Sequence, residues 1–190
     1  MAAADPHYYM LDCRLADAML LSHIQHVGDQ SWFSGQRFTG EPEDPVVVEI
    51  RAGYEKRGLK EFFPAQMLMR DDLVETIRKA SVDNIDVYDA VIRDMKSKRD
   101  YKNFKAVNVI GVVSAADLKG TVFNAANPSR LVDADVDSLQ IDPKRAGGAL
   151  MFRLAETITG LVVHENVKNA VEAAAIFPNI VFHEPEHWMG

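Results

Sequence analysis

Two stretches of the chain share one pattern of apolar and polar positions. Residues 67–80 align without gaps to residues 161–174, and residues 84–88 then align to residues 179–183 after one inserted residue. Each stretch begins with an apolar run, continues with apolar positions at helical spacing, and ends with Asn before a second apolar run. The pattern predicts two similar strand-helix-strand units.

The helical part of each unit has matching apolar positions. Leu73 and Ile77 in the first unit align with Val167 and Val171 in the second. Positions three to four residues apart lie on one face of a helix, so we expect both helices to bury this face against a sheet. The first helix is predicted to begin at Arg70 or Asp71, since a carboxylate there stabilises the positive end of the helix dipole.

Further strands are expected outside the two units. The most apolar run, from Val107 to Val113, predicts one continuous interior strand, and it follows a basic loop over residues 93–105. Residues 30–45 are rich in Gly and Pro and predict turns. The remaining candidate strands are Tyr8–Leu11, Val46–Ile50, Asp137–Ile141 and Leu150–Leu154. Together these elements predict an α+β fold with a mixed, largely antiparallel sheet and a few packed helices.

The length and composition favour one globular domain over residues 1–190. No low-complexity linker divides the 190 residues, and 47% of them are hydrophobic. No apolar run approaches the roughly 20 residues that span a bilayer, and the first residues lack the basic and apolar regions of a secretory signal. The chain has one cysteine, Cys13, and so no internal disulfide. We therefore expect a cytoplasmic protein that does not enter a membrane.

The net charge of −7 is unevenly distributed. Six basic and two acidic residues between 93 and 105 give a local charge of +4, so the remainder carries −11. An acidic protein repels phosphate backbones and attracts basic surfaces, which disfavours nucleic-acid binding and favours a basic macromolecular partner. The alternative is that the acidic runs are solvated loops that maintain solubility. Two clusters carry much of the negative charge: Glu41, Glu43 and Asp44, and Asp133, Asp135 and Asp137.

No catalytic or metal-binding motif agrees with its sequence context. His183 and His187 fit the zinc motif H-E-x-x-H, but Pro185 lies inside the turn that must be helical, and the preceding residues read as a strand. The run from residue 133 begins like a calcium loop, yet Ser138 and Lys144 replace its glycine and its final glutamate. Phosphate-binding loops and nucleophile elbows are absent. We therefore assign no catalytic residue, metal ligand or cofactor.

The aromatic residue Trp32 allows two interpretations. Together with Phe33 and Phe38 it could form a platform that binds a partner, or it could anchor the Gly- and Pro-rich loop to the core.

The order of these features along the chain resembles a known family. The residues that carry the resemblance run from Tyr8–Asp12 through Trp32 and Asn84 to the sequence Leu-Met-Phe-Arg at residues 150–153 and the final helix and strand. They resemble the immunity-protein family associated with bacterial polymorphic and contact-delivered toxins, long filed as a family of unknown function. The resemblance implies a non-enzymatic protein that binds and neutralises a cognate toxin or effector encoded nearby. It supplies no catalytic residues.

Two other classes of function remain open from the sequence. One is a hydrolase or transferase with a site built from dispersed residues, and the other is an accessory protein or chaperone for a secreted effector. On the immunity interpretation, the candidate partner-binding residues are Trp32 and the two acidic clusters. The oligomeric state is left open.

Overall fold

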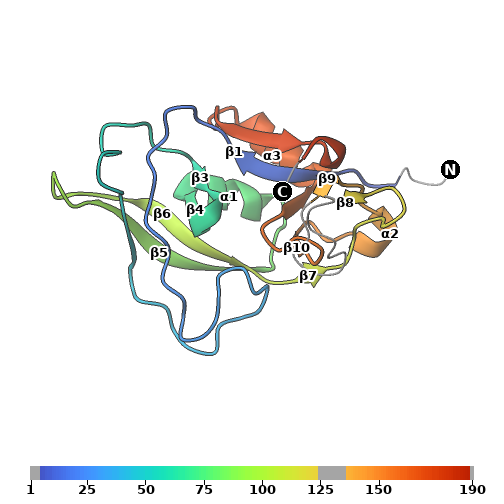
Figure 1. Ribbon diagram of the computed structural model, residues 1–190, viewed down its shortest axis with the longest axis horizontal. Coiled ribbons are helices and arrows are strands. Elements are labelled where there is room, and N and C mark those ends of the chain that lie inside the picture. Colours follow the sequence, from blue (N-terminus) through green and yellow to red (C-terminus); the bar gives the residue numbers. More distant parts are fainter. Residues whose placement is uncertain (1–4, 124–135, 189–190) are drawn as a thin grey trace.

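The computed structural model describes residues 5–123 and 136–188, and these form an α+β fold (Figure 1). Two mixed, mostly antiparallel five-stranded sheets have the strand orders β12-β1-β11-β10-β7 and β2-β5-β6-β4-β3, and β8 pairs with β9 separately. The predicted fold class is confirmed.

The first sheet contains β1 (Tyr8–Cys13), β7 (Val112–Val113), β10 (Met151–Leu154), β11 (Leu161–His164) and β12 (Ile180–His183). The second contains β2 (Val46–Glu49), β3 (Phe62–Phe63), β4 (Leu68–Arg70), β5 (Ile85–Asp94) and β6 (Arg99–Val109). The separate pair is β8 (Val122–Phe123) and β9 (Val136–Ser138). The helices are α1 (Asp71–Lys79), α2 (Pro143–Ala146) and α3 (Glu165–Ala174), with 3-10 turns η1 (Pro64–Gln66) and η2 (Pro185–His187).

The two strand-helix-strand units are present, and each is split by an inserted strand. In β4-α1-β5 both strands are antiparallel to β6, which lies between them, so β4 and β5 are parallel. In β11-α3-β12 the inserted antiparallel strand is β1. The registers also correspond, because Ala106 pairs with Leu68 and Tyr88, whereas Met10 pairs with the aligned residues Val162 and His183.

The correspondence extends to the strand that precedes each unit. Phe63 of β3 pairs with Leu68, and Phe152 of β10 pairs with the aligned Val162. After these residues the chains differ. Pro64 leaves the sheet and begins η1, whereas the equivalent Arg153 stays in β10 and pairs with Leu161.

The aligned apolar residues of the two helices meet in one core. Leu73, Ile77, Val167 and Val171 are each at most 3% exposed and belong to the same hydrophobic cluster. The helices contact one another, and residues of both sheets contribute to the cluster. The burial predicted for these four positions is confirmed.

Residues 107–113 do not form one strand. The strand β6 lies inside the second sheet but ends at Val109, and the chain then crosses into the first sheet, where β7 is an edge strand. The crossing takes place at Gly111, whose φ of +118° lies in a region that side chains disfavour. The prediction of one continuous interior strand is therefore wrong.

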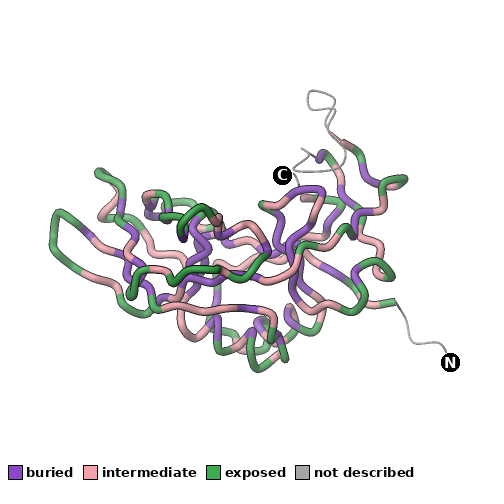
Figure 2. Tube along the Cα trace, turned by 90° about the horizontal axis from the view of Figure 1, so that it is seen from below, coloured by how far each residue is buried: buried purple, intermediate pink, exposed green. Residues whose placement is uncertain are grey.

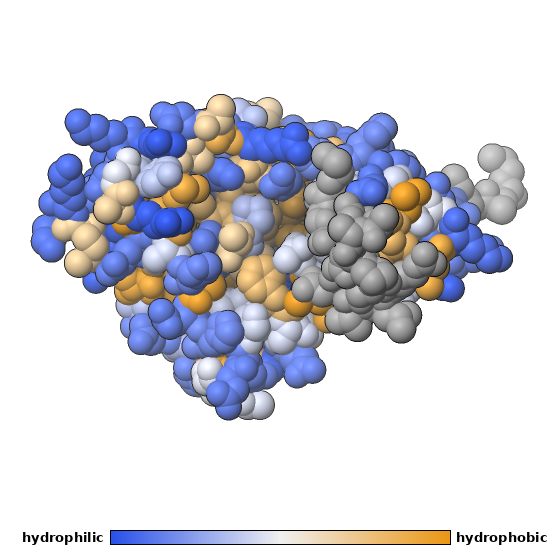
Figure 3. Space-filling view, in the orientation of Figure 1, coloured by the Kyte–Doolittle hydropathy of each residue, from blue (hydrophilic) through white to orange (hydrophobic). Residues whose placement is uncertain are grey.

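The basic segment after Asp94 is a hairpin rather than a loop. Strands β5 and β6 continue through most of it, and only residues 95–98 form a turn. The Asp94 carboxylate closes this turn by accepting hydrogen bonds from the backbone N–H groups of Lys96 and Ser97. The hairpin projects at the left of Figure 1, its tip is exposed in Figure 2, and that end of the molecule is mostly hydrophilic in Figure 3.

None of the helices in the described part of the chain is long and apolar enough to cross a bilayer.

Candidate partner-binding site

The first acidic cluster lies on the loop that leads into β2. Glu41, Glu43 and Asp44 are exposed, and none of them forms an ion pair within residues 5–123 and 136–188. We call these three residues the acidic loop. Because no ion pair in the described part of the chain engages these carboxylates, their charges can attract an external partner.

Trp32 anchors the segment before the acidic loop. Its side chain is 1% exposed, and its indole Nε1–H donates a hydrogen bond of 2.8 Å to the Gln25 carbonyl. The ring makes edge contacts with Phe38 and Tyr88, at centroid distances of 4.9 and 5.8 Å. The indole is therefore packed into the core, which agrees with the interpretation of Trp32 as an anchor of the loop.

Hydrogen bonds within the segment restrict its conformation further. The Gln30 side chain accepts a hydrogen bond of 2.6 Å from the Thr39 backbone N–H and donates one to the Arg37 carbonyl. Both groups that meet Gln30 lie just before Glu41. The acidic loop therefore continues from a segment fixed to the core, which lowers the entropy lost when a partner binds.

Glu41 and Pro42 form a ridge between two pockets. On one side is a pocket of about 230 Å³, lined by Trp32, Glu41 and Glu43 together with residues 25–28. On the other is a pocket of about 430 Å³, lined in part by Arg37 and Tyr88. Arg37 is bound to Asp86 at 2.7 Å, so its charge is already paired. Glu41 and Pro42 therefore border both pockets.

The second acidic cluster lies elsewhere. Asp137 is exposed in β9, which pairs with β8 outside the sheet that contains β2. Asp133 and Asp135 lie outside the described residues. The structure does not join Asp137 to the acidic loop in one surface.

Arg153, which the sequence interpretation did not single out as a site residue, is fully buried and holds the Trp32 segment to the first sheet. Its guanidinium lies 4.5 Å from the centroid of Phe33 and donates hydrogen bonds to the carbonyls of Ile158 at 2.9 Å and Trp32 at 3.4 Å. Burial lowers the pKa of Arg153 to about 10. In the sequence, the only indication of a special role for Arg153 is that it is the last residue of the Leu-Met-Phe-Arg motif.

Cys13 belongs to a buried polar group between the two sheets. Its Sγ lies 3.5 Å from Glu61 Oε2, and the Asn179 amide donates to both oxygens of that carboxylate at 3.1 Å. Burial, with a smaller effect of the Glu61 charge, raises the pKa of Cys13 to about 11. The thiol is therefore protonated at neutral pH, whereas a cysteine nucleophile must be a thiolate.

The H-E-x-x-H sequence lies where a strand ends. His183 is the last residue of β12, and Pro185–His187 form η2, so the two histidines are not on one face of an α-helix. His183 Nε2 is 3.7 Å from Asp12 Oδ2. Within the residues that the structure describes, no three His, Cys, Asp or Glu side chains are grouped to hold a metal ion.

Comparison with known proteins adds no family. No protein-family model matches the chain, and no curated protein matches its sequence significantly.

Proposed function

We propose that this chain is a non-enzymatic immunity protein, which binds and neutralises a cognate bacterial toxin through the acidic loop. The observation that carries the proposal is a set of three exposed carboxylates, Glu41, Glu43 and Asp44, on a segment anchored by Trp32. None of the three forms an ion pair among the residues that the structure describes. The resemblance of the sequence to toxin-immunity proteins supports the same function.

The charge of the acidic loop defines the kind of toxin that fits. A toxin that acts on nucleic acid presents a basic cleft to the phosphate backbone, and carboxylates can occupy such a cleft. Opposite charges also accelerate the encounter of two proteins, in a manner that salt screens. The net charge of −7 adds a long-range attraction of the same sign.

The test is the binding of this chain to the product of the adjacent gene, measured as association and dissociation rates at two ionic strengths. For the variant Glu41→Lys/Glu43→Lys/Asp44→Lys, the association rate at low salt should fall by about tenfold or more. This rate should also depend less on salt than that of the wild type. It should also fail to protect cells that express the toxin.

A matched control reverses three charges that are scattered over the surface. Asp5, Asp83 and Glu186 are exposed, and no ion pair forms at them in the described part of the chain. The variant Asp5→Lys/Asp83→Lys/Glu186→Lys changes the net charge equally and should retain most of the association rate. If association slows equally in both variants, the acidic loop acts only through the net charge of the protein. If the unmodified chain neither binds the toxin nor protects cells, the proposal of immunity is wrong.

A further inference from the structure

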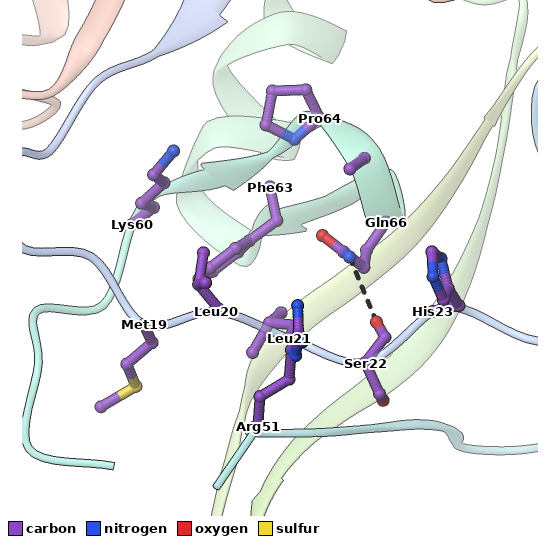
Figure 4. A pocket seen from close by; sticks show the side chains of 11 residues that line it. Met19, Leu20, Leu21, Ser22, His23, Arg51, Lys60, Phe63, Pro64 and Gln66 are labelled. Atoms are coloured by element: carbon purple, nitrogen blue, oxygen red, sulfur yellow. Dashed lines mark hydrogen bonds between the residues drawn. The ribbon is translucent and has the colours of Figure 1, made fainter. Parts of the chain in front are cut away.

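The largest pocket of those described lies away from the acidic loop. It has a volume of about 540 Å³, within the range of small-molecule sites. Four separate segments line it: residues 19–23, Arg51, Lys60 and residues 63–66. Figure 4 shows Arg51 and Lys60 on opposite sides of Leu20 and Phe63.

The charge of this pocket has the opposite sign to that of the whole protein. His23, Arg51 and Lys60 line it, no carboxylate does, and none of the three makes an ion pair within the described residues. Lys60 is half-buried at the edge of the pocket. In a chain of net charge −7, this arrangement favours a negatively charged ligand.

The walls between the cations are apolar. Leu20 is 40% exposed and lies beside Phe63, and Pro64 lines the same pocket. An apolar group of a ligand would cover Leu20 and remove its surface from water.

Gln66 adds a specific polar contact. The residue is 8% exposed, and its Nε2 donates a hydrogen bond of 3.1 Å to the Ser22 carbonyl. A carbonyl can only accept, so this bond fixes the amide nitrogen toward Ser22. The amide oxygen has no partner in the described residues and is turned toward Phe63 in Figure 4. It can accept a hydrogen bond from a ligand.

The lining lacks two features with which proteins often hold a phosphate, so we take the anion to be a carboxylate. Proteins often hold phosphates with backbone N–H groups at a helix start or in a glycine-rich loop. No glycine lines this pocket, and η1 begins with Pro64, which has no N–H. The site offers side-chain cations, which bind a carboxylate through charge-assisted hydrogen bonds.

We propose that this pocket binds a small organic carboxylate that carries an apolar group and an N–H donor. Arg51 binds the carboxylate, Leu20 and Phe63 contact the apolar group, and the Gln66 amide oxygen accepts the N–H. Lys60, on the other side of Leu20 and Phe63, adds a longer-range attraction for the anion. This binding activity is separate from toxin neutralisation, and its test requires no toxin.

The probe is N-acetyl-L-phenylalanine, which has all three features, and its uncharged primary amide is the matched control ligand. Both are titrated into the full chain and followed by ¹H–¹⁵N NMR. The acid should produce saturable shifts at Gln66 and its neighbours in the pocket, and the primary amide should bind about tenfold or more weakly because the charge is lost.

Two double variants locate the site. Arg51→Gln/Lys60→Gln should weaken binding about tenfold or more, since a charge-assisted hydrogen bond to Arg51 contributes on that scale. Lys98→Gln/Lys102→Gln removes the same charge from the β5–β6 hairpin and should leave binding unchanged. If the pocket double variant unfolds in a thermal control, Leu20→Ser tests the same pocket at an exposed position and should also weaken binding. Absence of saturation, equal affinity for the acid and its amide, or equal loss in the hairpin variant would overturn the proposal.

Discussion

The two split strand-helix-strand units have the same arrangement but obtain their inserted strand in different ways. In the first unit, β6 follows β5 after a four-residue turn. In the second, β1 comes from the N-terminal end of the chain and is separated from β11 by about 150 residues. The first unit can therefore form from local contacts, whereas the second requires closure of nearly the whole chain.

The units also differ at the residue that follows their first strand. Arg153 continues β10 and is buried, whereas the equivalent Pro64 turns the chain out of the sheet. The resulting η1 turn supplies Pro64, Ala65 and Gln66 to the pocket proposed to bind a carboxylate. The candidate ligand site thus arises where one unit departs from the pattern that both share.

The largest expected effect concerns the contact between the helices. Leu73→Asp and Val167→Asp should each lower the free energy of unfolding by about 3–5 kcal/mol, because a carboxylate is buried without a partner. Both wild-type residues are 0% exposed and occupy aligned positions. Urea unfolding followed by circular dichroism measures the change. As a control, Glu75→Ala at an exposed position of α1 should change stability by less than about 0.5 kcal/mol.

A large loss in one unit only would contradict the equivalence of the two helices. If Val167→Asp were tolerated, α3 would have to rotate its apolar face out of the core, and the correspondence with α1 would be a property of the sequence alone.

The sequence predicts the helices and most strands of these units because their signals are local. Apolar spacing at Leu73 and Ile77 and the Asp71 start depend on neighbouring residues. The position of β1 between β11 and β12 depends on pairing with segments about 150 residues away, which one sequence does not reveal. The break at Gly111 had a signal, since a glycine within an apolar run often marks a bend.

The candidate sites were predictable to different degrees. The acidic loop appears as a charge cluster in the sequence, whereas the pocket around Gln66 combines ordinary residues from four separate segments. Nothing about Arg51, Lys60 or Leu20 alone indicates a site. Only the fold brings them together.

The second prediction tests the local and distant closure of the two units. Leu11 in β1 and Val107 in β6 occupy equivalent buried positions. Leu11→Ala should destabilise the chain by about 2–4 kcal/mol through a cavity. In native-state hydrogen exchange, it should accelerate exchange in β11 and β12 more than in β4 and β5, because β1 closes only the second unit. Val107→Ala should have the reverse pattern, and uniform acceleration in both variants would show that the units open together.

The third prediction uses a difference in chemistry at equivalent positions. Cys13 in β1 corresponds to Val109 in β6, and its pKa is raised from 9.0 to about 11 by burial. Between these values the unfolded chain loses the thiol proton while the folded chain keeps it, so the wild-type free energy of unfolding falls as pH rises. Cys13→Val removes this dependence. The free energy of unfolding of the Cys13→Val variant, minus that of the wild type, should increase by about 1–2 kcal/mol from pH 8 to pH 10.5 in urea unfolding experiments. A pH-independent difference would contradict the raised pKa.

The smallest expected effect distinguishes the exposed sides of the two helices. Lys168 Nζ in α3 is 2.7 Å from Glu172 and 5.1 Å from the centroid of the Tyr9 ring. Lys79 in α1 is 3.8 Å from Glu75, and both of those side chains are more than two-thirds exposed. Lys168→Gln should therefore cost about 0.5–1 kcal/mol, since it loses an ion pair and a contact with an aromatic face. Lys79→Gln should cost less than about 0.5 kcal/mol, because solvent screens its ion pair with Glu75.

Repeating the urea unfolding in about 1 M NaCl should remove most of the Lys79 effect and leave part of the Lys168 effect, since the ring contact also includes the apolar lysine stem. Equal costs in both helices at low salt would mean that Tyr9 contributes nothing and that β1 joins the second unit through its buried face alone.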